Sequence, residues 1–184
     1  MTQGELSPAL FLDRDGIINI DTGFVNKRED FIFQDSIFEL CRYFKAKGFK
    51  LVVITNQSGI GRGLFTLEDF HQINNWMMNR FEQEGCHLDL VMASTLDPNN
   101  TDASTYEKRH RKPLPGMLTS ASEVLHLDLE ESVLIGDRYS DIQAGHSAGL
   151  KKLFLVHPEA SHSDEHESFK SIAGCLVRLQ ELIP

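Results

Sequence analysis

Two aspartates separated by one residue follow an apolar run near the start of the chain. Residues 9–12 are apolar, Asp13 and Asp15 come next, and Gly16 breaks the run. A short run of this kind predicts a buried strand that ends in a turn. Two carboxylates this close repel each other unless a cation lies between them, and carboxylate oxygens suit Mg²⁺, so the pair predicts a magnesium site. Asp and Gly are also common turn residues, so the pair alone fits a simple turn equally well.

Three further segments carry polar groups where an apolar run ends or where a helix is expected to begin. Residues 51–54 lead to a hydroxyl and two amides, two cations precede a proline, and residues 132–135 lead to Gly-Asp with another aspartate beyond. In order, these groups are Thr55, Asn56 and Gln57, then Arg111 and Lys112, then Gly136, Asp137 and Asp141. Because open α/β sheets bind ligands at the carboxyl ends of their strands, we expect the groups to converge on one site.

The order of these groups, DxDG, then T-N-Q, then K-P, then GDxxxD, resembles the HAD (haloacid dehalogenase-like) phosphohydrolase superfamily. The resemblance implies an α/β protein with a three-layer α/β/α Rossmannoid fold and a mainly parallel sheet. The alternation of predicted strands and helices independently favours a parallel sheet with helices on both faces. Segments 17–34 and 94–112 are too short for a folded insertion, so we expect no separate cap domain and an open site roofed by loops.

Within this resemblance, the residues are expected to divide the work of phosphoryl transfer. Asp13 is the expected nucleophile, which forms an aspartyl-phosphate, and Asp15 protonates the leaving alkoxide and later accepts a proton from water. The Thr55 hydroxyl and the Asn56 N–H can donate to the phosphoryl oxygens, and Lys112 offers them a point charge. The expected Mg²⁺ contacts are Asp13, Asp15 through its backbone carbonyl, and Asp137.

Longer segments narrow the resemblance to the D-glycero-D-manno-heptose 1,7-bisphosphate 7-phosphatase family. These are residues 11–19, 21–25, 55–63, 111–118 and 135–141, within a resemblance that covers about residues 9–156. The resemblance implies hydrolysis of the 7-phosphate. The substrate contacts that it implies, besides the catalytic groups, are Asp21, Thr22, Gly23, Phe24, Asn56, Gln57, Ser58, Arg111 and Arg138.

Two other classes of function compete with this interpretation. Histidinol-phosphate phosphatases share much of the pattern, and a phosphatase for another small phosphate ester is compatible with it, although residues 58–63 favour the heptose family. A non-catalytic phosphate-binding scaffold is disfavoured, because it would need neither Asp13 nor Asp15. Asp141 is open to two interpretations, as a helix N-cap or as a residue beside the metal, and Arg138 is expected to face either substrate or solvent.

The family usually carries a structural zinc site in the loop that here spans residues 94–112, with Cys-x-His early in the loop and Cys-x-Cys directly before Arg-Lys-Pro. Here Ser94 and Leu96 stand at the first pair, and Lys108 and His110 stand at the second. With no thiols to converge, we expect no structural zinc. His157, His162 and His166 could bind a soft metal, but polar loops of this composition are more often simply solvated.

Composition limits the protein's class. The chain has 184 residues, 41% hydrophobic and 24% charged, which predicts a single globular domain over residues 1–184. The net charge of −9 argues against nucleic acid as the main partner and leaves room for a small sugar phosphate at a local basic cluster. Three scattered cysteines, a polar start over residues 1–8 and the absence of long apolar runs predict a cytoplasmic protein without signal peptide or membrane span. We expect a monomer or weak homo-oligomer.

The elements that must position these groups follow from apolar runs, caps and glycines. Strands are expected at residues 9–12, 49–54, 88–93, 132–137 and 152–156. Helices are expected at about 36–47, 66–84, 116–126, 141–148 and 168–182, the second of them capped by Thr66 with Asp69. A small hairpin or flap is expected within residues 17–33, and loops are expected at 59–63, 94–112 and 157–166.

Overall fold

The computed structural model describes residues 6–159 and 161–184. Residues 1–5, part of the polar start in which we expect no signal peptide, and residue 160, within the predicted 157–166 loop, lie outside the described residues. In chain order the elements are β1 (Ser7–Leu12), η1 (Arg28–Asp30), α1 (Ile37–Ala46), β2 (Lys50–Asn56), α2 (Ser58–Gly61), α3 (Leu67–Gln83), β3 (Leu90–Ser94), α4 (Thr105–Arg109), α5 (Gly116–Leu125), β4 (Leu127–Gly136), α6 (Tyr139–Ser147), β5 (Lys152–Val156), β6 (Glu167–Phe169) and α7 (Ile172–Leu182).

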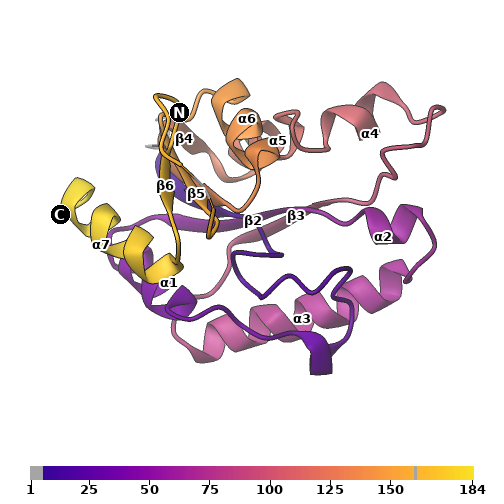
Figure 1. The fold of residues 1–184 in the computed structure, drawn as a ribbon, viewed down its shortest axis with the longest axis horizontal. Helices are drawn as coiled ribbons and strands as arrows, with labels where there is room; N and C mark the ends of the chain where they lie inside the picture. Colours follow the sequence, from indigo (N-terminus) through magenta and orange to yellow (C-terminus); the bar gives the residue numbers. More distant parts are fainter. Residues whose placement is uncertain (1–5, 160) are drawn as a thin grey trace, which may run out of the picture.

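The strands form one six-stranded sheet in the order β3-β2-β1-β4-β5-β6, and every neighbouring pair is parallel (Figure 1). β1 lies inside the sheet, with Leu12 level with Val53 of β2 and with Ile135 of β4. The predicted parallel sheet is confirmed. A strand buried on both faces has no polar side to show, which is why residues 9–12 of β1, 51–54 of β2 and 133–135 of β4 are continuous apolar runs.

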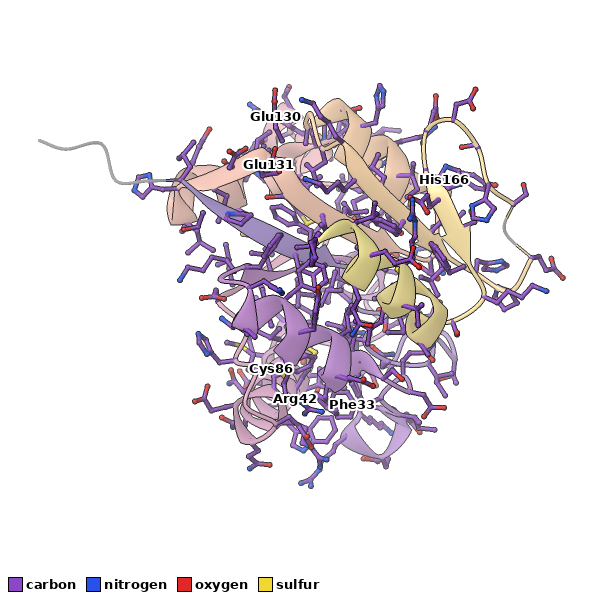
Figure 2. All side chains as sticks on the ribbon, turned by 90° about the vertical axis from the view of Figure 1, so that its left-hand side faces the viewer. Phe33, Arg42, Cys86, Glu130, Glu131 and His166 are labelled. Atoms are coloured by element: carbon purple, nitrogen blue, oxygen red, sulfur yellow. The ribbon has the colours of Figure 1, made fainter. Side chains whose placement is uncertain are left out.

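Helices cover both faces of this sheet, as Figure 1 shows. Successive side chains of β1 point to opposite faces: Leu10 and Leu12 pack with α1, α3 and α7, whereas Ala9 and Phe11 pack with α5 and α6. The two cores together make the three-layer α/β/α arrangement expected from the resemblance. In the view of Figure 2, Arg42 and Cys86 lie toward the α1 and α3 side of the molecule, and Glu130 and Glu131 lie toward the other.

Several local predictions are confirmed. Thr66 and Asp69 form a reciprocal capping box, in which the Thr66 side chain accepts from the Asp69 N–H and the Asp69 carboxylate accepts from the Thr66 N–H. Within the predicted flap, Asn19 and Phe33 form an antiparallel bridge. Ser36 is the N-cap residue of α1, although its side chain makes no capping hydrogen bond.

Other local predictions are wrong. The helix expected from residue 168 begins at Ile172 after the Ser171 cap, because residues 167–169 form the edge strand β6 against β5. Residues 58–61 of the predicted glycine loop form the short helix α2, and residues 105–109 of the predicted polar loop form α4. β4 also begins earlier than expected, at Leu127, where it pairs with Ser7.

Candidate active site

The carboxyl ends of β1 and β4 meet in the middle of the sheet, where the chain changes the direction in which it adds strands. The chain runs from β1 outward through β2 to β3, and then returns to place β4 on the other side of β1. Asp13 follows β1 and Asp137 follows β4, and the Asp13 N–H donates to the Ile135 carbonyl at 3.1 Å. Parallel α/β sheets bind ligands at such a switch point, so the topology brings these aspartates to the expected place.

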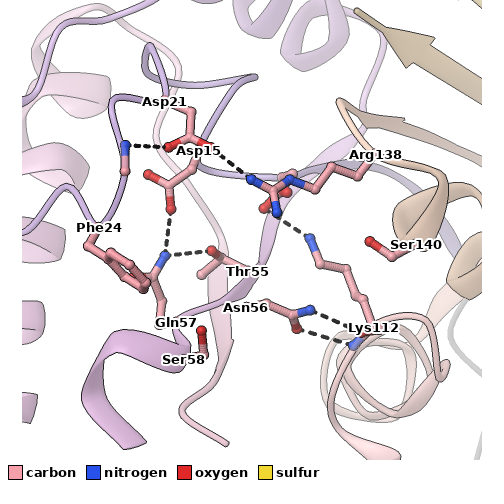
Figure 3. Close-up of a pocket in the computed structure, with 12 residues that line it drawn as sticks. Asp15, Asp21, Phe24, Thr55, Asn56, Gln57, Ser58, Lys112, Arg138 and Ser140 are labelled. Carbon is pink, nitrogen blue, oxygen red and sulfur yellow. Dashed lines mark hydrogen bonds and ion pairs between the residues drawn. The ribbon is translucent and has the colours of Figure 1, made fainter. Parts of the chain in front are cut away.

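The Asp15 carboxylate accepts hydrogen bonds from three side chains. Arg14, which is completely buried, donates from Nη2 to both Asp15 oxygens at 2.9 Å, and Asn19 Nδ2 donates to Oδ1 at 3.0 Å. Gln57 Nε2 donates both to Asp15 Oδ2 and to Thr55 Oγ1, each at 2.8 Å (Figure 3). The Gln57 amide, predicted to bind substrate, is therefore engaged by the two predicted catalytic residues on either side of it.

Lys112 lies among acids at the base of the site. Its Nζ is 2.9 Å from Asp13 Oδ1 and 2.6 Å from Asp141 Oδ1, and it donates to the Ile54 carbonyl at 2.9 Å. Burial alone would lower the pKa of Lys112, but Asp13 and Asp141 raise it above its ordinary value, so the group stays an ammonium ion. The Asn56 side chain bonds the Lys112 backbone at both its N–H and its carbonyl (3.1 and 3.0 Å; Figure 3), which fixes the position of this cation.

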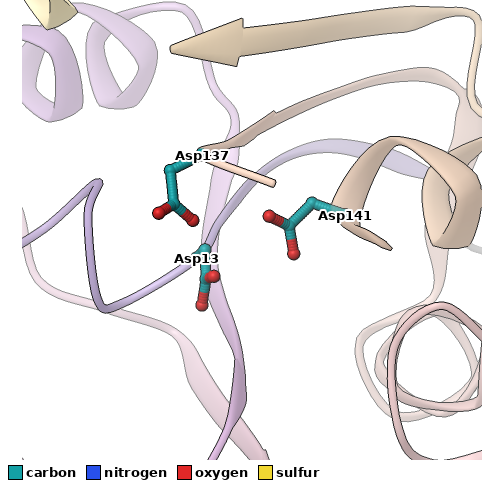
Figure 4. A group of neighbouring side chains, drawn as sticks. All are labelled: Asp13, Asp137 and Asp141. Atoms are coloured by element: carbon teal, nitrogen blue, oxygen red, sulfur yellow. The ribbon is translucent and has the colours of Figure 1, made fainter. Parts of the chain in front are cut away.

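Asp13, Asp137 and Asp141 form a buried acidic cluster, with one oxygen from each lying within 4.8 Å of the others (Figure 4). Burial, together with the neighbouring acids, raises the pKa of Asp13 to about 8 against the pull of Lys112. Burial, with Asp141 beside it, raises the pKa of Asp137 to about 6. Asp137 Oδ1 is buried and has no hydrogen-bond partner among the described residues. A set of hard oxygen donors with an unsatisfied buried oxygen fits Mg²⁺.

A cavity of about 190 Å³ opens at this end of the sheet and collects most of the predicted site residues. Arg138 and Asp21 face it as an ion pair with 2.9 Å between Nη2 and Oδ2, so Arg138 contacts the site although its side chain is largely exposed (Figure 3). The residues that line the cavity are Asp13, Asp15, Asp21, Gly23, Phe24, Thr55, Asn56, Gln57, Ser58, Lys112, Arg138 and Ser140.

Three predicted residues do not line this cavity. Asp137 lines an adjoining cavity of about 500 Å³, which shares Asp21 and Arg138 with the first. Arg111 lines a third cavity of about 290 Å³, which shares Lys112 with the first. Its Nη1 donates to the Leu96 carbonyl at 3.2 Å. Thr22 is exposed and lines none of the three.

Comparison with known proteins places this geometry in a family. Residues 109–178 match a family model described as HAD-hydrolase-like. A D-glycero-alpha-D-manno-heptose-1,7-bisphosphate 7-phosphatase of Burkholderia mallei is 46% identical over 149 residues, which cover 80% of this chain and 79% of that protein. The chain belongs to the heptose-1,7-bisphosphate 7-phosphatase family. A Helicobacter pylori member, named for the beta anomer, is 44% identical over 149 residues, or 80% of this chain and 83% of that protein.

A solved structure of the heptose bisphosphate phosphatase family has the same fold. The D,D-heptose 1,7-bisphosphate phosphatase from B. bronchiseptica, complexed with magnesium and phosphate, superposes with a TM-score of 0.82. It is 26% identical and covers 95% of this chain and 99% of that chain. The predicted superfamily, family and fold class are thereby confirmed. In residues 6–159 and 161–184, no helix combines the length and the apolar character needed to cross a membrane.

In this member of the heptose bisphosphate phosphatase family, hydrogen bonds hold the segment where relatives are expected to bind zinc. The His110 ring lies against Tyr106 with 4.0 Å between centroids. Its Nδ1 is hydrogen-bonded with the Tyr106 carbonyl at 2.8 Å and its Nε2 with Ser120 Oγ at 2.9 Å. Lys108 Nζ donates to the Thr101 carbonyl at 3.2 Å. The side chains of His110 and Lys108 are thus engaged in hydrogen bonds within residues 101–120, and the absence of zinc stays a prediction.

The three histidines near the carboxyl terminus each bond their own loop. His162 Nδ1 accepts from the Ser168 N–H at 2.9 Å, and His157 Nδ1 accepts from the Glu159 N–H at 3.2 Å. His166, which Figure 2 shows beside β6, is hydrogen-bonded through Nδ1 with Ser163 Oγ at 2.8 Å. In the described part of the chain, the one group of acids, histidines and cysteines with metal-ligand spacing is the acidic cluster.

Sequence reasoning missed or underrated some residues of the site. Asp141 is not the N-cap of α6, which is Arg138; it lies at the third helical position, where its carboxylate accepts from the Arg138 N–H at 3.0 Å, and it also borders Asp13 in the acidic cluster. The GDxxxD spacing was the available signal. Asn19 was missed as a partner of Asp15, because only the tight turn from Arg14 to Asn19 brings them together, and no local pattern predicts it. Arg14 is the buried cation that holds the Asp15 carboxylate.

Proposed function

We propose that this protein is a Mg²⁺-dependent phosphatase that removes the 7-phosphate of D-glycero-D-manno-heptose 1,7-bisphosphate. The observation that carries the proposal is the constellation at the switch point. Asp13 lies 2.9 Å from the Lys112 ammonium and within 4.8 Å of two further acids, and the neighbouring Asp15 is held in position by Arg14 and Gln57. Membership of the heptose bisphosphate phosphatase family supplies the substrate class.

The proposed reaction has two steps that use the same two carboxylates. An Asp13 oxygen attacks phosphorus, the bond from phosphorus to the sugar oxygen breaks, and Asp15 gives that oxygen its proton. A water molecule then attacks the aspartyl-phosphate, Asp15 takes a proton from it, and inorganic phosphate leaves as the Asp13 carboxylate is restored. Lys112 and the Thr55 hydroxyl hold the phosphoryl oxygens. Mg²⁺, when bound at the acidic cluster, neutralises the negative charge of those oxygens.

The second phosphate of the substrate is proposed to bind to protein cations instead of the metal. Arg111 lines the cavity next to the reaction cavity, and Lys112 lies between the two. A guanidinium can hold a phosphate through two parallel hydrogen bonds, which suits Arg111 to a bisphosphate substrate. Arg138, paired with Asp21 at the rim, is proposed to contact the sugar side of the substrate.

A phosphate-release assay tests this function directly. The alpha and beta anomers of heptose 1,7-bisphosphate should be compared with histidinol phosphate, since relatives are named for each anomer. We expect turnover of a heptose bisphosphate to exceed that of histidinol phosphate by at least a hundredfold in kcat/KM, about 2.7 kcal/mol. Preference for histidinol phosphate would assign the chain to that activity. Failure to cleave any phosphate ester, with Mg²⁺ present, would leave the scaffold interpretation.

The remote phosphate is tested by Arg111→Ala. If Arg111 binds it, KM should rise strongly for the sugar bisphosphate and weakly for para-nitrophenyl phosphate, a simple monophosphate ester. An equal loss with both esters would mean that Arg111 serves the reacting phosphoryl group or the fold, and the argument for a bisphosphate substrate would lose its support.

A further inference from the structure

The short helix α2 lies between the loop of Phe24, which borders the reaction cavity, and residues 95–97, of which Leu96 borders the cavity of Arg111. A side chain at Gly59 would overlap the rings of Phe65 and Phe24, because its Cβ would lie 2.2 and 2.9 Å from their nearest atoms. A side chain at Gly61 would overlap the Thr95 carbonyl at 2.5 Å and the Asp97 nitrogen at 2.7 Å. Real Cβ atoms do not approach this closely. The glycines therefore let α2 touch the loop of Phe24 on one side and residues 95–97 on the other.

Arg62, directly after α2, contacts both of these segments. Its Nε lies 3.4 Å from Asp97 Oδ1, and its Cζ lies 5.9 Å from the centroid of the Phe24 ring, which lines the reaction cavity. Asp97 Oδ1 also accepts from the Asn99 N–H at 3.1 Å, so the carboxylate that pairs with Arg62 anchors the turn that follows it. One guanidinium thus ties the 95–100 segment to the loop of Phe24.

Arg111 depends on the same segment for its position. Its Nη1 donates to the carbonyl of Leu96, the residue next to Asp97, so Arg62 and Arg111 hold adjacent residues. Arg111 has a partly buried side chain that forms no direct ion pair in the described residues; Asp97, which pairs with Arg62, attracts it only from a longer distance. A cation left without a partner carboxylate, beside a cavity, is suited to an anionic ligand.

We propose that Arg62 is a positioning residue for the remote phosphate: it holds residues 95–97 against α2 and so fixes the carbonyl on which Arg111 rests. The proposal rests on the proposed function, because it assigns the remote phosphate to Arg111. The proposal adds Arg62 as a residue that acts through Arg111. It also means that the Arg62–Asp97 ion pair holds a segment in which we expect no zinc.

Steady-state kinetics with two esters test this role. Arg62→Ala should raise KM for the heptose bisphosphate about tenfold, leave its kcat within about twofold, and leave KM for para-nitrophenyl phosphate within about twofold. Arg62→Lys, which keeps the charge but loses the planar group over Phe24, should fall between wild type and Arg62→Ala. Asp97→Asn should behave like Arg62→Ala, because it removes the paired charge and keeps an oxygen for the Asn99 N–H.

The double variant Arg62→Ala/Arg111→Ala separates a positioning role from direct contact. If Arg62 acts through Arg111, the double variant is no worse with the bisphosphate than Arg111→Ala alone. Effects that multiply would mean that Arg62 binds the substrate itself, which overturns the proposal. An equal rise of KM for both esters in Arg62→Ala overturns it as well.

Amide hydrogen exchange gives a readout that needs no substrate. Arg62→Ala should speed exchange over residues 95–100 and leave the strands unchanged. The matched control is Arg80→Ala. Arg80 also pairs with an acid, Glu84, at 2.7 Å, and its guanidinium lies 5.6 Å from the centroid of the Phe38 ring, but it lies on α3, away from residues 95–100. If wild-type protein fails to cleave the bisphosphate, the proposed function is wrong. The exchange data still test the positioning role of Arg62, because unchanged exchange over residues 95–100 in Arg62→Ala refutes that role.

Discussion

Lys112 and Asp141 form an ion pair that is almost completely removed from solvent, with 2.6 Å between Nζ and Oδ1 and side-chain exposures of 2% and 1%. The pair comes from two distant segments, one before α5 and one inside α6. Because Asp13 lies on the other side of the same ammonium group, Lys112 neutralises part of a buried acidic cluster as well as facing the reaction cavity.

Lys112→Ala should therefore damage both stability and activity. Removing one partner of a buried pair leaves uncompensated charge, so we expect the free energy of unfolding to fall by about 3 kcal/mol and kcat/KM to fall at least a hundredfold. Urea denaturation and the release assay measure the two effects. The matched control is Lys151→Ala, which breaks the exposed pair with Glu130 and should change stability by less than about 0.5 kcal/mol. A stable Lys112→Ala protein would contradict the expected role of the pair.

Asp13→Asn should lower kcat by more than about a thousandfold, which corresponds to about 4 kcal/mol, and should leave a well-folded protein. The pKa of the folded carboxyl is raised from 3.8 to about 8 by burial. Between these values the folded state holds a proton that the unfolded state has lost, so stability falls as pH rises through this interval. Asparagine does not titrate. In EDTA, the melting temperature of the variant minus that of wild type should increase from pH 5 to pH 8. A difference that stays constant over this range would refute the prediction.

Mg²⁺ should be required and should compete with protons. EDTA should remove the activity and added Mg²⁺ should restore it, because the acidic cluster supplies hard oxygen donors. Below the Asp13 pKa of about 8, the metal must displace a proton, so the Kd for Mg²⁺ should fall about tenfold per pH unit from pH 6 to pH 8. Calorimetry measures the slope. In the Asp13→Asn protein the slope should be shallower, and a pH-independent Kd in wild type would count against this cluster as the metal site.

Elemental analysis should find no stoichiometric zinc in protein purified without added metal. The His110 ring is hydrogen-bonded at both nitrogens and Leu96 carries no donor atom in its side chain, so these positions make a poor tetrahedral thiolate site. A zinc protein of known stoichiometry, measured alongside, tests whether the assay detects bound zinc. One tightly held zinc per chain would show that other residues of the 94–112 segment bind it.

Gln57→Leu should lower kcat more than it changes KM. The Gln57 amide donates to Asp15 and Thr55, so its loss frees the expected proton donor to move and leaves substrate contacts largely in place. We expect a fall in kcat of about tenfold to a hundredfold, or 1.4 to 2.7 kcal/mol, with KM within about threefold. Gln72→Leu, on the exposed side of α3, is the control. A large rise of KM with unchanged kcat would restore the prediction that Gln57 binds substrate.

The sequence predicts the central part of the fold well because burial there leaves a local pattern. Strands inside a parallel sheet are apolar on both faces, so β1, β2 and β4 read directly from their composition. The edge strand β6 has no such pattern: residues 167–169 are specified by pairing with β5, and only the three-dimensional structure reveals it. The glycines at 59 and 61 suggest flexibility in the sequence, but in the fold they allow close packing.

The same limit applies to the candidate site. Residues that come directly from a strand end, such as Asp13, Thr55 and Asp137, are predictable because the topology fixes where strand ends lie. Side chains that reach across the site are not, because their direction depends on partners elsewhere. Arg111 was expected to contact substrate, but no local pattern predicts that its side chain also donates to the Leu96 carbonyl, or that the Asn56 amide bonds the Lys112 backbone.

The position of β1 inside the sheet also has a consequence for how the protein is made. Of the strands in this sheet, β1 is synthesised before the others; it pairs on one side with β4, residues 127–136, and Asp13 meets Asp137 and Asp141 only when those residues have followed. Until then β1 has one exposed edge, which other chains can pair with and chaperones can protect. The acidic cluster therefore assembles late in synthesis, and binding of Mg²⁺ would report that the central strands have closed around it.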